Sequence, residues 1–480
     1  RRNSYYQDAY IKNGYLEGEL EGAYAIKRPG FKLLIDFATQ TGYTPVLGTP
    51  LASYEFQGAL ALGDTTIYFV IGTREFRINP GASTPLSMSE VVATGGIVAG
   101  ERLRAVIPVS SSVPWQGMSG IYRSGYAPIA PARPLIPSLC ELDQTFYVMD
   151  IDGVIRASAI GDIATWPALN TIKAFMQTLG VSLERHLQYL IAFSTQETKV
   201  YYDAGISPGA PIAQETSFVS HIGVPYAAAP AIQHLGDVMY WLGQSQADGL
   251  GVYMMTGLQV QKISTPEIDR FLADNFTNFL QTFSTSYTQV MAPNSIRAMT
   301  VEAGGHSFYI LTCPTSTTAG STIVYDITMQ VWYLWDQFEA GWTGELRGMA
   351  NFGMVGNALN FIPGYNNGKI YTLDPNYYQD TGSPITFEVQ TASYNWGNSR
   401  TKLIAATYVN SDTLATTFNL SWTDDDYVTY TTPQAISAAL SKKQLVCCGS
   451  TIERAWRITH TDNTPMRVYQ LEVEVLPGAL

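Results

Sequence analysis

The feature of this sequence that most constrains its fold is a recurring unit of two apolar strands joined by a short polar turn. Each first strand contains aromatic residues, and the second strand often contains Tyr with Asp or Gly just after it. The units lie at 65–78, 145–160, 189–205, 237–257, 306–335 and 360–374. Apolar segments bounded by Gly, Pro, Asn and Asp are typical of β-hairpins. The sequence therefore predicts an all-β fold.

The spacing of these units favours one all-β architecture. They recur at intervals of roughly 45 to 70 residues, which suits blades of four strands around an axis. This predicts a β-propeller-like subunit, with a two-sheet sandwich as the alternative. The expected turns lie near Gly72, at Asp152-Gly153, near Gln196, and at 247–249 and 366–368.

The composition agrees with many turns and a large buried surface. Charged residues make up only 14% of the 480 residues, against roughly 25% in an average soluble protein. The chain holds 30 Tyr, 41 Gly and 25 Pro, which supply packing area and turns. A low charge fraction also suits a protein that buries surface in an assembly.

We expect three parts along the chain. Residues 1–50 form an N-terminal arm and entry strands, and residues 51–375 form the propeller. The Gly-, Pro- and Ser-rich stretch at about 80–135 predicts a long loop insertion. Residues 376–480 form a C-terminal β region, with the alternative that this region completes the propeller.

One helix is predicted, at 264–276. Thr265 suits the N-cap, and Pro266 suits the first helical position. The apolar residues that follow at helical spacing form one face of the helix. They are Ile268, Phe271, Leu272 and Phe276.

The stretch YTLDPNYYQDTGSPI, 371–385, has the composition of a loop with a role. A joint between the propeller and the C-terminal region is the favoured interpretation, and a metal or sugar site is the alternative. Asp374 before Pro375 favours the start of a turn. We expect Asp380 to bond its local backbone.

The sequence predicts no catalytic, cofactor-binding or metal-ligating residue. No two of the five histidines stand at metal-ligand spacing, and no HExxH is present. The histidines are His186, His221, His234, His306 and His460. Four cysteines form no disulfide framework, and we expect them to be buried free thiols. They are Cys140, Cys313, Cys447 and Cys448. The glycine spacing around Ser119 differs from that of a nucleophile elbow.

Two stretches keep a carbohydrate site open as an alternative. Asp336 and Glu339 lie among tryptophans, as the carboxylates of a glycosidase do. The tryptophans are Trp332, Trp335 and Trp342. This rival hypothesis is a propeller that cleaves or binds host polysaccharide. A packed polar turn is the favoured interpretation.

The segment SWTDDDYVTY, 421–430, resembles the Asp box, the hairpin turn of sialidase-type propellers. Asp425 and Thr429 match that pattern and Thr423 stands in the place of its serine, whereas Tyr427 replaces its glycine and Tyr430 its tryptophan. The box is a structural device in that family, so the resemblance concerns architecture. Calcium binding by 424–426 is the alternative.

The charge and hydropathy of the chain exclude a basic nucleic-acid-binding surface and a membrane-spanning apolar run. The formal net charge is −12, and no basic stripe marks a nucleic-acid-binding surface. The small basic clusters at 101–106 and 441–445 are interpreted as solvated strand ends. No run of 18 apolar residues could span a membrane, and no signal peptide is recognisable.

Several stretches in order resemble a known family. They are YAIKRPGF (24–31), LIAFSTQETKVYYDAG (190–205), Tyr325-Asp326 with Trp332, GKIYTLDPNYYQDTGSPI (368–385), the turn at 421–430, and RAWRITHTDNTPMRVYQLEVEV (454–475). Together they resemble the tail hub, or nozzle, proteins of short-tailed bacteriophages, the packaged-DNA stabilisation family. The stretch at 80–135 is not covered.

The resemblance implies a structural protein of the virion tail, made and assembled in the host bacterial cytoplasm, and not an enzyme. It implies a homohexameric ring below the portal and adaptor that continues the DNA channel, retains packaged DNA, anchors fibres or tailspikes and opens for ejection. A tail needle or plug is a further expected partner, and genomic DNA passes without sequence-specific binding. Six copies would carry −72, six times the −12 of one chain. An acidic bore would repel phosphates, and an acidic outer surface for solubility is the alternative.

Overall fold

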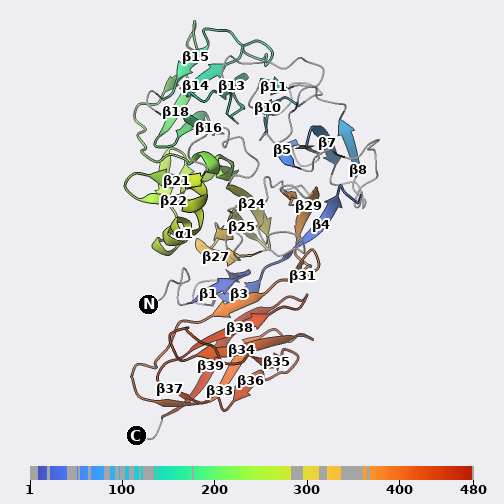
Figure 1. Cartoon of the computed structure of the whole chain (residues 1–480), viewed down its shortest axis with the longest axis vertical. Coiled ribbons are helices and arrows are strands. Elements are labelled where there is room, and N and C mark those ends of the chain that lie inside the picture. The colour runs from blue at the N-terminus through green and yellow to red at the C-terminus, as the bar shows by residue number, and fades with distance from the viewer. Residues whose placement is uncertain are drawn as a thin grey trace.

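Hairpins that follow one another along the chain build a ring of β-sheets in the computed structural model (Figure 1). The structure describes residues 9–18, 22–39, 51, 55–62, 66–79, 87–91, 97, 103–106, 113–117, 120–122, 134–136, 138–175, 178–282, 296–312, 322–336, 360–364 and 368–477. Figure 1 shows the first strands of sheets, such as β5, β16 and β24, nearer the centre of the ring than the last strands of the same sheets. This is the arrangement of propeller blades.

Within the described residues, seven blades can be followed in chain order. The first three contain β5 (Phe56–Leu62), β6 (Thr66–Ile71), β7 (Arg74–Asn79) and β8 (Ser87–Val91); β9 (Arg104–Ala105), β10 (Trp115–Gly117) and β11 (Gly120–Tyr122); and β12 (Cys140–Leu142), β13 (Thr145–Met149), β14 (Val154–Ala157) and β15 (Thr171–Lys173).

The next three blades contain β16 (Gly180–His186), β17 (Tyr189–Ser194), β18 (Thr198–Asp203) and β19 (Ile212–Gln214); β20 (Gln233–Leu235), β21 (Val238–Ser245), β22 (Gly249–Thr256) and β23 (Gln259–Lys262); and β24 (Arg297–Ala303), β25 (His306–Thr312), β26 (Thr322–Asp326) and β27 (Val331–Trp335). The 3₁₀ helix η1 (Tyr226–Ala231) precedes the fifth blade, and α1 (Pro266–Thr282) follows it.

The seventh blade joins the two ends of the propeller sequence. It contains β28 (Ile362–Pro363), β29 (Lys369–Asp374) and β4 (Gly30–Asp36), in that order. β4 pairs antiparallel with β29, so that Phe31 lies opposite Leu373. The N-terminal strand β4 therefore closes the ring. The C-terminal region, which the sequence left as an alternative, does not.

Aromatic side chains fill the space between neighbouring blades. Phe193 of β17 and Trp241 of β21 lie with ring centroids 5.6 Å apart, and Tyr240 lies 5.6 Å from Tyr309 of the next blade. The Tyr309 hydroxyl donates to the carbonyl of Ala231, 2.7 Å away. Large aromatic rings bury much area at little cost in side-chain entropy, so the abundance of Tyr serves blade packing.

Most of the remaining strands form a sandwich of two sheets below the propeller (Figure 1), whereas β30 (Gln379–Asp380) and β31 (Ser383–Pro384) form a separate two-stranded sheet. One sheet contains β1 (Tyr10–Lys12), β32 (Phe387–Gln390), β38 (Ala455–His460), β34 (Thr417–Thr423) and β35 (Gln434–Ser437). The other contains β2 (Gly14–Glu17), β3 (Tyr24–Lys27), β39 (Arg467–Pro477), β33 (Lys402–Ser411) and β36 (Gln444–Val446), and β37 (Ser450–Thr451) pairs with β33. The core between them includes Phe387, Phe418, Leu420 and Trp456.

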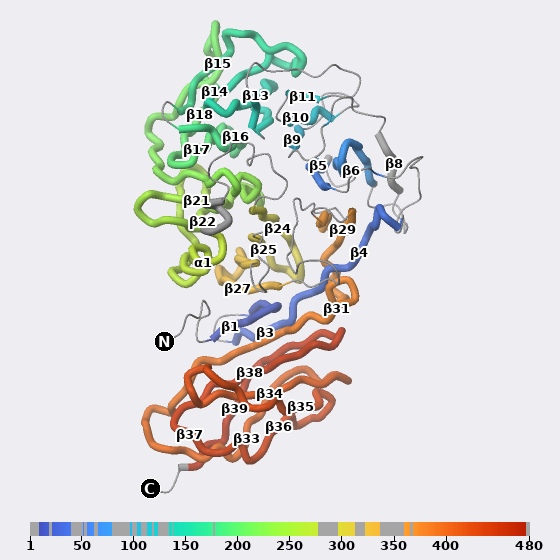
Figure 2. Tube along the Cα trace, viewed as in Figure 1, coloured from blue at the N-terminus to red at the C-terminus, as the bar shows by residue number. Residues whose placement is uncertain are grey.

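The sandwich is hydrogen-bonded to the propeller. β1 pairs parallel with β27 of the sixth blade and antiparallel with β32 of the sandwich. One nine-stranded sheet therefore runs from the sixth blade into the sandwich. Figure 2 shows the N-terminal strands lying between the propeller and the C-terminal strands.

Most local expectations agree with the structure, and two need correction. The predicted hairpins are present, and the predicted helix at 264–276 is confirmed as α1, with Phe271, Leu272 and Phe276 buried. The stretch at 80–135 is not only loop, because its described residues include β8, β9, β10 and β11. The expected arm at 1–50 is divided, since β1 to β3 enter the sandwich and β4 enters the propeller.

Candidate functional sites

A buried ion pair holds the propeller and the sandwich together at the stretch 371–385. The Arg28 guanidinium donates two hydrogen bonds to the Asp380 carboxylate, at 3.0 and 2.6 Å. Arg28 is 0% exposed and Asp380 is 2% exposed. Arg28 follows β3 of the sandwich and precedes β4 of the propeller. The pair therefore fixes the point at which the chain passes between the two parts.

The other donors of Arg28 are also used. Its Nε donates to Asn13 Oδ1 at 3.2 Å, and Nη2 donates to the Asp336 carbonyl at 2.6 Å. The guanidinium carbon lies 5.2 Å from the Phe31 ring centroid and 5.5 Å from that of Trp335. A planar, always charged donor suits such a site, because it can satisfy several acceptors at once.

The structure supports the joint interpretation of 371–385 and corrects one contact. Asp374 Oδ1 accepts a hydrogen bond from the Asn376 N–H at 2.9 Å, which is the expected turn. Asp380 does not bond only its local backbone, because it binds Arg28 and accepts from the Phe31 N–H at 3.0 Å. Both of these partners lie about 350 positions earlier in the chain.

Within the described residues, the two tryptophans near Asp336, Trp332 and Trp335, do not form an exposed sugar platform. Trp335 is 1% exposed, and its indole N–H donates to the Gly14 carbonyl at 3.1 Å. The Trp332 indole N–H donates to the Ile263 carbonyl at 2.9 Å. Asp336 forms an ion pair with Lys12 at 2.7 Å. Glu339 and Trp342 lie outside the described residues.

The Asp-box-like segment is a turn between β34 and β35. Asp425 Oδ1 accepts from the Thr423 hydroxyl at 2.7 Å and from the N–H groups of Val428 and Thr429 at 3.1 and 2.9 Å. Hydrogen bonds from Thr429 come first among the causes that lower the pKa of Asp425 to about 2. Tyr427 adopts a φ of 65° at the position that is glycine in the box. The segment therefore has the local geometry of a structural turn.

Asp424, another of the three candidate calcium ligands, is used elsewhere. Its carboxylate accepts from Arg454 at 2.7 and 2.8 Å. Among the residues that the structure describes, no group of three His, Cys, Asp or Glu side chains is arranged to hold a metal ion.

The cysteines differ from the expectation at one position. Cys140 and Cys448 are buried free thiols, whereas Cys447 is exposed. Cys447 lies where the chain leaves β36 with a φ of 57°. Cys313 lies outside the described residues. Burial raises the pKa of the Cys140 thiol, so this thiol is not activated as a nucleophile.

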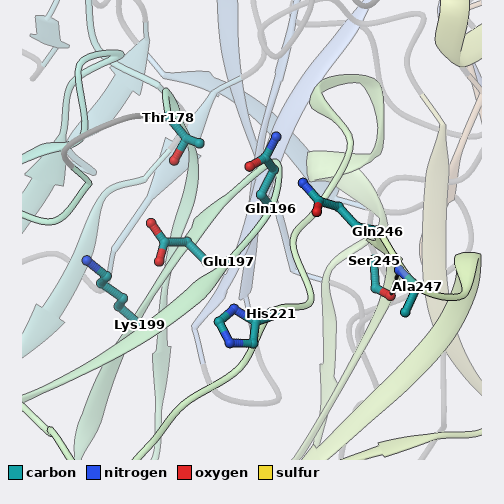
Figure 3. Close-up of a pocket in the computed structure, with 8 residues that line it drawn as sticks. All are labelled: Thr178, Gln196, Glu197, Lys199, His221, Ser245, Gln246 and Ala247. Atoms are coloured by element: carbon teal, nitrogen blue, oxygen red, sulfur yellow. Dashed lines mark hydrogen bonds between the residues drawn. The ribbon is translucent and has the colours of Figure 1, made fainter.

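A polar pocket between the fourth and fifth blades was missed by the sequence reasoning. It has a volume of about 470 Å³. Its lining comes from residues far apart in the chain: Thr178, Gln196, Glu197, Lys199, His221, Ser245, Gln246 and Ala247. Figure 3 shows these side chains around a common space, with Glu197 and Lys199 on one side and the 245–247 turn on the other. No motif brings these residues together, so only the blade packing reveals the pocket.

The comparison with protein families gives one match. The model of the phage stabilisation family, described as bacteriophage P22 Gp10, β-propeller, matches residues 139–378. That is half of the 480-residue chain. The chain belongs to the phage stabilisation family. The family resemblance and the propeller fold inferred from the sequence are both confirmed. The match begins at the third blade and ends two residues before Asp380, so it leaves the sandwich outside.

This family supports a structural role in a phage tail. No curated protein matches the sequence significantly. In the described part of the chain, no helix is long and apolar enough to cross a membrane.

Solved structures share only a weak similarity with this member of the phage stabilisation family. The extracellular domain of a one-component system from B. thetaiotaomicron matches with a TM-score of 0.42 and 11% identity, over 73% of this chain. This chain spans only 40% of the length of that protein. The Pan2 WD40 domain of Neurospora crassa matches with a TM-score of 0.40 and 10% identity, over 72% of this chain and 95% of that domain. At these scores, neither match adds to the argument.

Proposed function

We propose that this protein is the hub, or nozzle, subunit of a short-tailed phage. In this proposal, copies of the chain form a ring, with six as the expected number, that continues the DNA channel below the portal and adaptor. The ring retains packaged DNA, anchors fibres or tailspikes, and opens when DNA is ejected. The observation that carries the proposal is the family match across the propeller at 139–378.

The joint between the two parts supports a mechanical role. The propeller and the sandwich share a continuous sheet through β1 and a buried ion pair between Arg28 and Asp380. A subunit with both features resists bending between its parts, since motion would break strand pairing and expose a buried charge pair. A ring that holds DNA under pressure needs subunits of this kind.

The charge of the chain is compatible with a conduit. A net charge of −12 gives an assembled ring a strongly negative field. Acidic residues facing the bore would keep DNA from binding, so that it slides.

The decisive experiment measures the mass of the full chain in solution, alone and after mixing with the portal–adaptor complex of the same phage. We expect a species of about six chains, either alone or only on the adaptor. Adaptor without portal and portal without adaptor serve as controls for the docking partner. The proposal is wrong if the chain stays a monomer and binds neither the portal–adaptor complex nor the adaptor or portal alone.

A further inference from the structure

The pocket between the fourth and fifth blades has a fixed frame. The segment that links these blades is paired to both, because Thr198 bonds Ser220, and Gly223 and Gln244 exchange N–H to carbonyl hydrogen bonds of 2.9 Å each. The Gln244 side-chain amide also donates to the Thr195 carbonyl at 2.7 Å. A pocket built on such a frame needs little reorganisation to bind a ligand.

The linking segment approaches the fourth blade closely enough to require glycine at one position. A Cβ atom on Gly223 would lie 2.2 Å from the carbonyl carbon of Thr195 and 2.3 Å from the Gln196 nitrogen. Glycine allows two backbones to approach in this way. The walls of the pocket are therefore set by backbone contact between the linking segment and the fourth blade, and the lining side chains project from a rigid base.

The lining side chains offer unused hydrogen-bonding groups of both kinds. Within the described residues, the Glu197 carboxylate and the side-chain amides of Gln196 and Gln246 form no hydrogen bond to another side chain or to the backbone. The Thr178 hydroxyl oxygen is buried and has no partner in that part of the chain. Lys199 Nζ donates one hydrogen bond, of 2.7 Å, to the Ala174 carbonyl. Carboxylate and amide oxygens accept, and amide and ammonium groups donate.

The lining also excludes two kinds of ligand. Ala247 is its one wholly apolar side chain, so an apolar ligand would leave polar groups without partners. The charges of Glu197 and Lys199 cancel, which weakens binding of a phosphate or any other strongly charged ligand. A neutral ligand that carries many hydroxyl groups satisfies donors and acceptors together. The volume of about 470 Å³ lies within the range of small-molecule sites.

We propose that this pocket binds a neutral, polyhydroxylated ligand of the saccharide class. The side chains that recognise it are Glu197, Lys199, Gln196 and Gln246. The site provides reversible binding and no chemistry. The proposal does not depend on the hub function, because it concerns a pocket within one chain and is tested without any tail partner.

The test uses the full chain and saturation-transfer NMR with glucose, galactose, N-acetylglucosamine and lactose as probes. We expect at least one to bind with a dissociation constant on the order of 1 mM, as for a small polar ligand. Inorganic phosphate is the charged comparison and is expected to bind more weakly. Binding of phosphate but of none of the sugars would overturn the proposal.

Variants assign the binding to the pocket. Glu197→Gln removes the charged acceptor and is expected to weaken binding by about tenfold or more, and Ala247→Trp is expected to fill the space and abolish binding. Glu215→Gln is the matched control, since Glu215 is partly exposed, follows the last strand of the fourth blade and lies outside the lining. If no probe binds, or if Glu197→Gln and Glu215→Gln bind sugar equally well, the proposal is wrong. The proposal is also wrong if the residues that line the pocket become protected from solvent only inside an assembled tail, because the pocket is then a contact between proteins.

Discussion

Replacing Arg28 with methionine tests whether the propeller and the sandwich are locked by one buried ion pair. Arg28→Met keeps an unbranched apolar stem but removes the guanidinium that Asp380 accepts from at 2.6 and 3.0 Å. The Asp380 carboxylate, 2% exposed, would then be a buried charge without its cation. The backbone carbonyl of Asp336 would also lose a donor at 2.6 Å.

The expected loss in the free energy of unfolding is large. Removing one partner of a buried, hydrogen-bonded pair typically costs about 3–5 kcal/mol in the free energy of unfolding. The matched control is Lys32→Met, which breaks the Lys32–Asp374 ion pair of 3.0 Å in the seventh blade. The Lys32 side chain is 56% exposed, so this change should cost only about 0–1 kcal/mol. The double variant Arg28→Met/Asp380→Leu should recover part of the loss, because no isolated charge remains.

Unfolding in guanidinium chloride, followed by tryptophan fluorescence, measures these differences in the free energy of unfolding. Because the pair joins two parts of the chain, Arg28→Met should also separate their transitions, so that the curve shows two steps. The reasoning is refuted if Arg28→Met and Lys32→Met cost the same, within about 1 kcal/mol, and both curves keep the shape of the parent protein.

Two further predictions concern the same region. His460 is buried, and its Nε2 forms a hydrogen bond of 2.9 Å with the Thr416 hydroxyl. Burial, with Lys27 nearby, lowers the pKa of His460 to about 4 from 6.5. The folded protein therefore resists this protonation, and stability falls as pH drops from about 6.5 towards 4, by up to about 3 kcal/mol. His460→Gln should flatten that part of the stability profile and His221→Gln, at an exposed position, should leave it unchanged; equal profiles for both variants would contradict the assignment. Gly30→Ala should destabilise the joint by about 2 kcal/mol or more, since its Cβ would lie 1.9 Å from the Gln379 carbonyl oxygen. Gly22→Ala, with no heavy atom within 4 Å of the added carbon, should change the unfolding midpoint little, and a similar shift for both would refute the steric argument.

Local structure was accessible from the sequence because its signals are local. The turn at Asp152-Gly153 joins β13 and β14, and Gly153 adopts a φ of 74° that favours glycine. The helix at 264–276 has a starting proline and an apolar face, and both are found in α1. Such patterns depend on neighbours within a few residues, so spacing alone reveals them.

The long-range pairings were not accessible in the same way. Arg28 and Asp380 are 352 positions apart, and nothing near either residue indicates the other. The same holds for β4, whose partner β29 begins at Lys369. The pocket residues come from two blades and from the segments that precede and follow the fourth blade, and they share no motif. Where packing between distant segments decides the structure, composition and periodicity carry no information about partners.

The closure of the ring by β4 has a consequence for synthesis on the ribosome. β4 is synthesised before the first six blades, whereas its partner β29, which ends at Asp374, is made only after them. The partner of β3 is made later still, because β3 pairs with β39 (Arg467–Pro477). During this interval the early strands present unpaired edges, which favour aggregation. Contacts this distant in sequence also slow folding. The nascent chain therefore depends on protection of β3 and β4 until β29 and β39 are released.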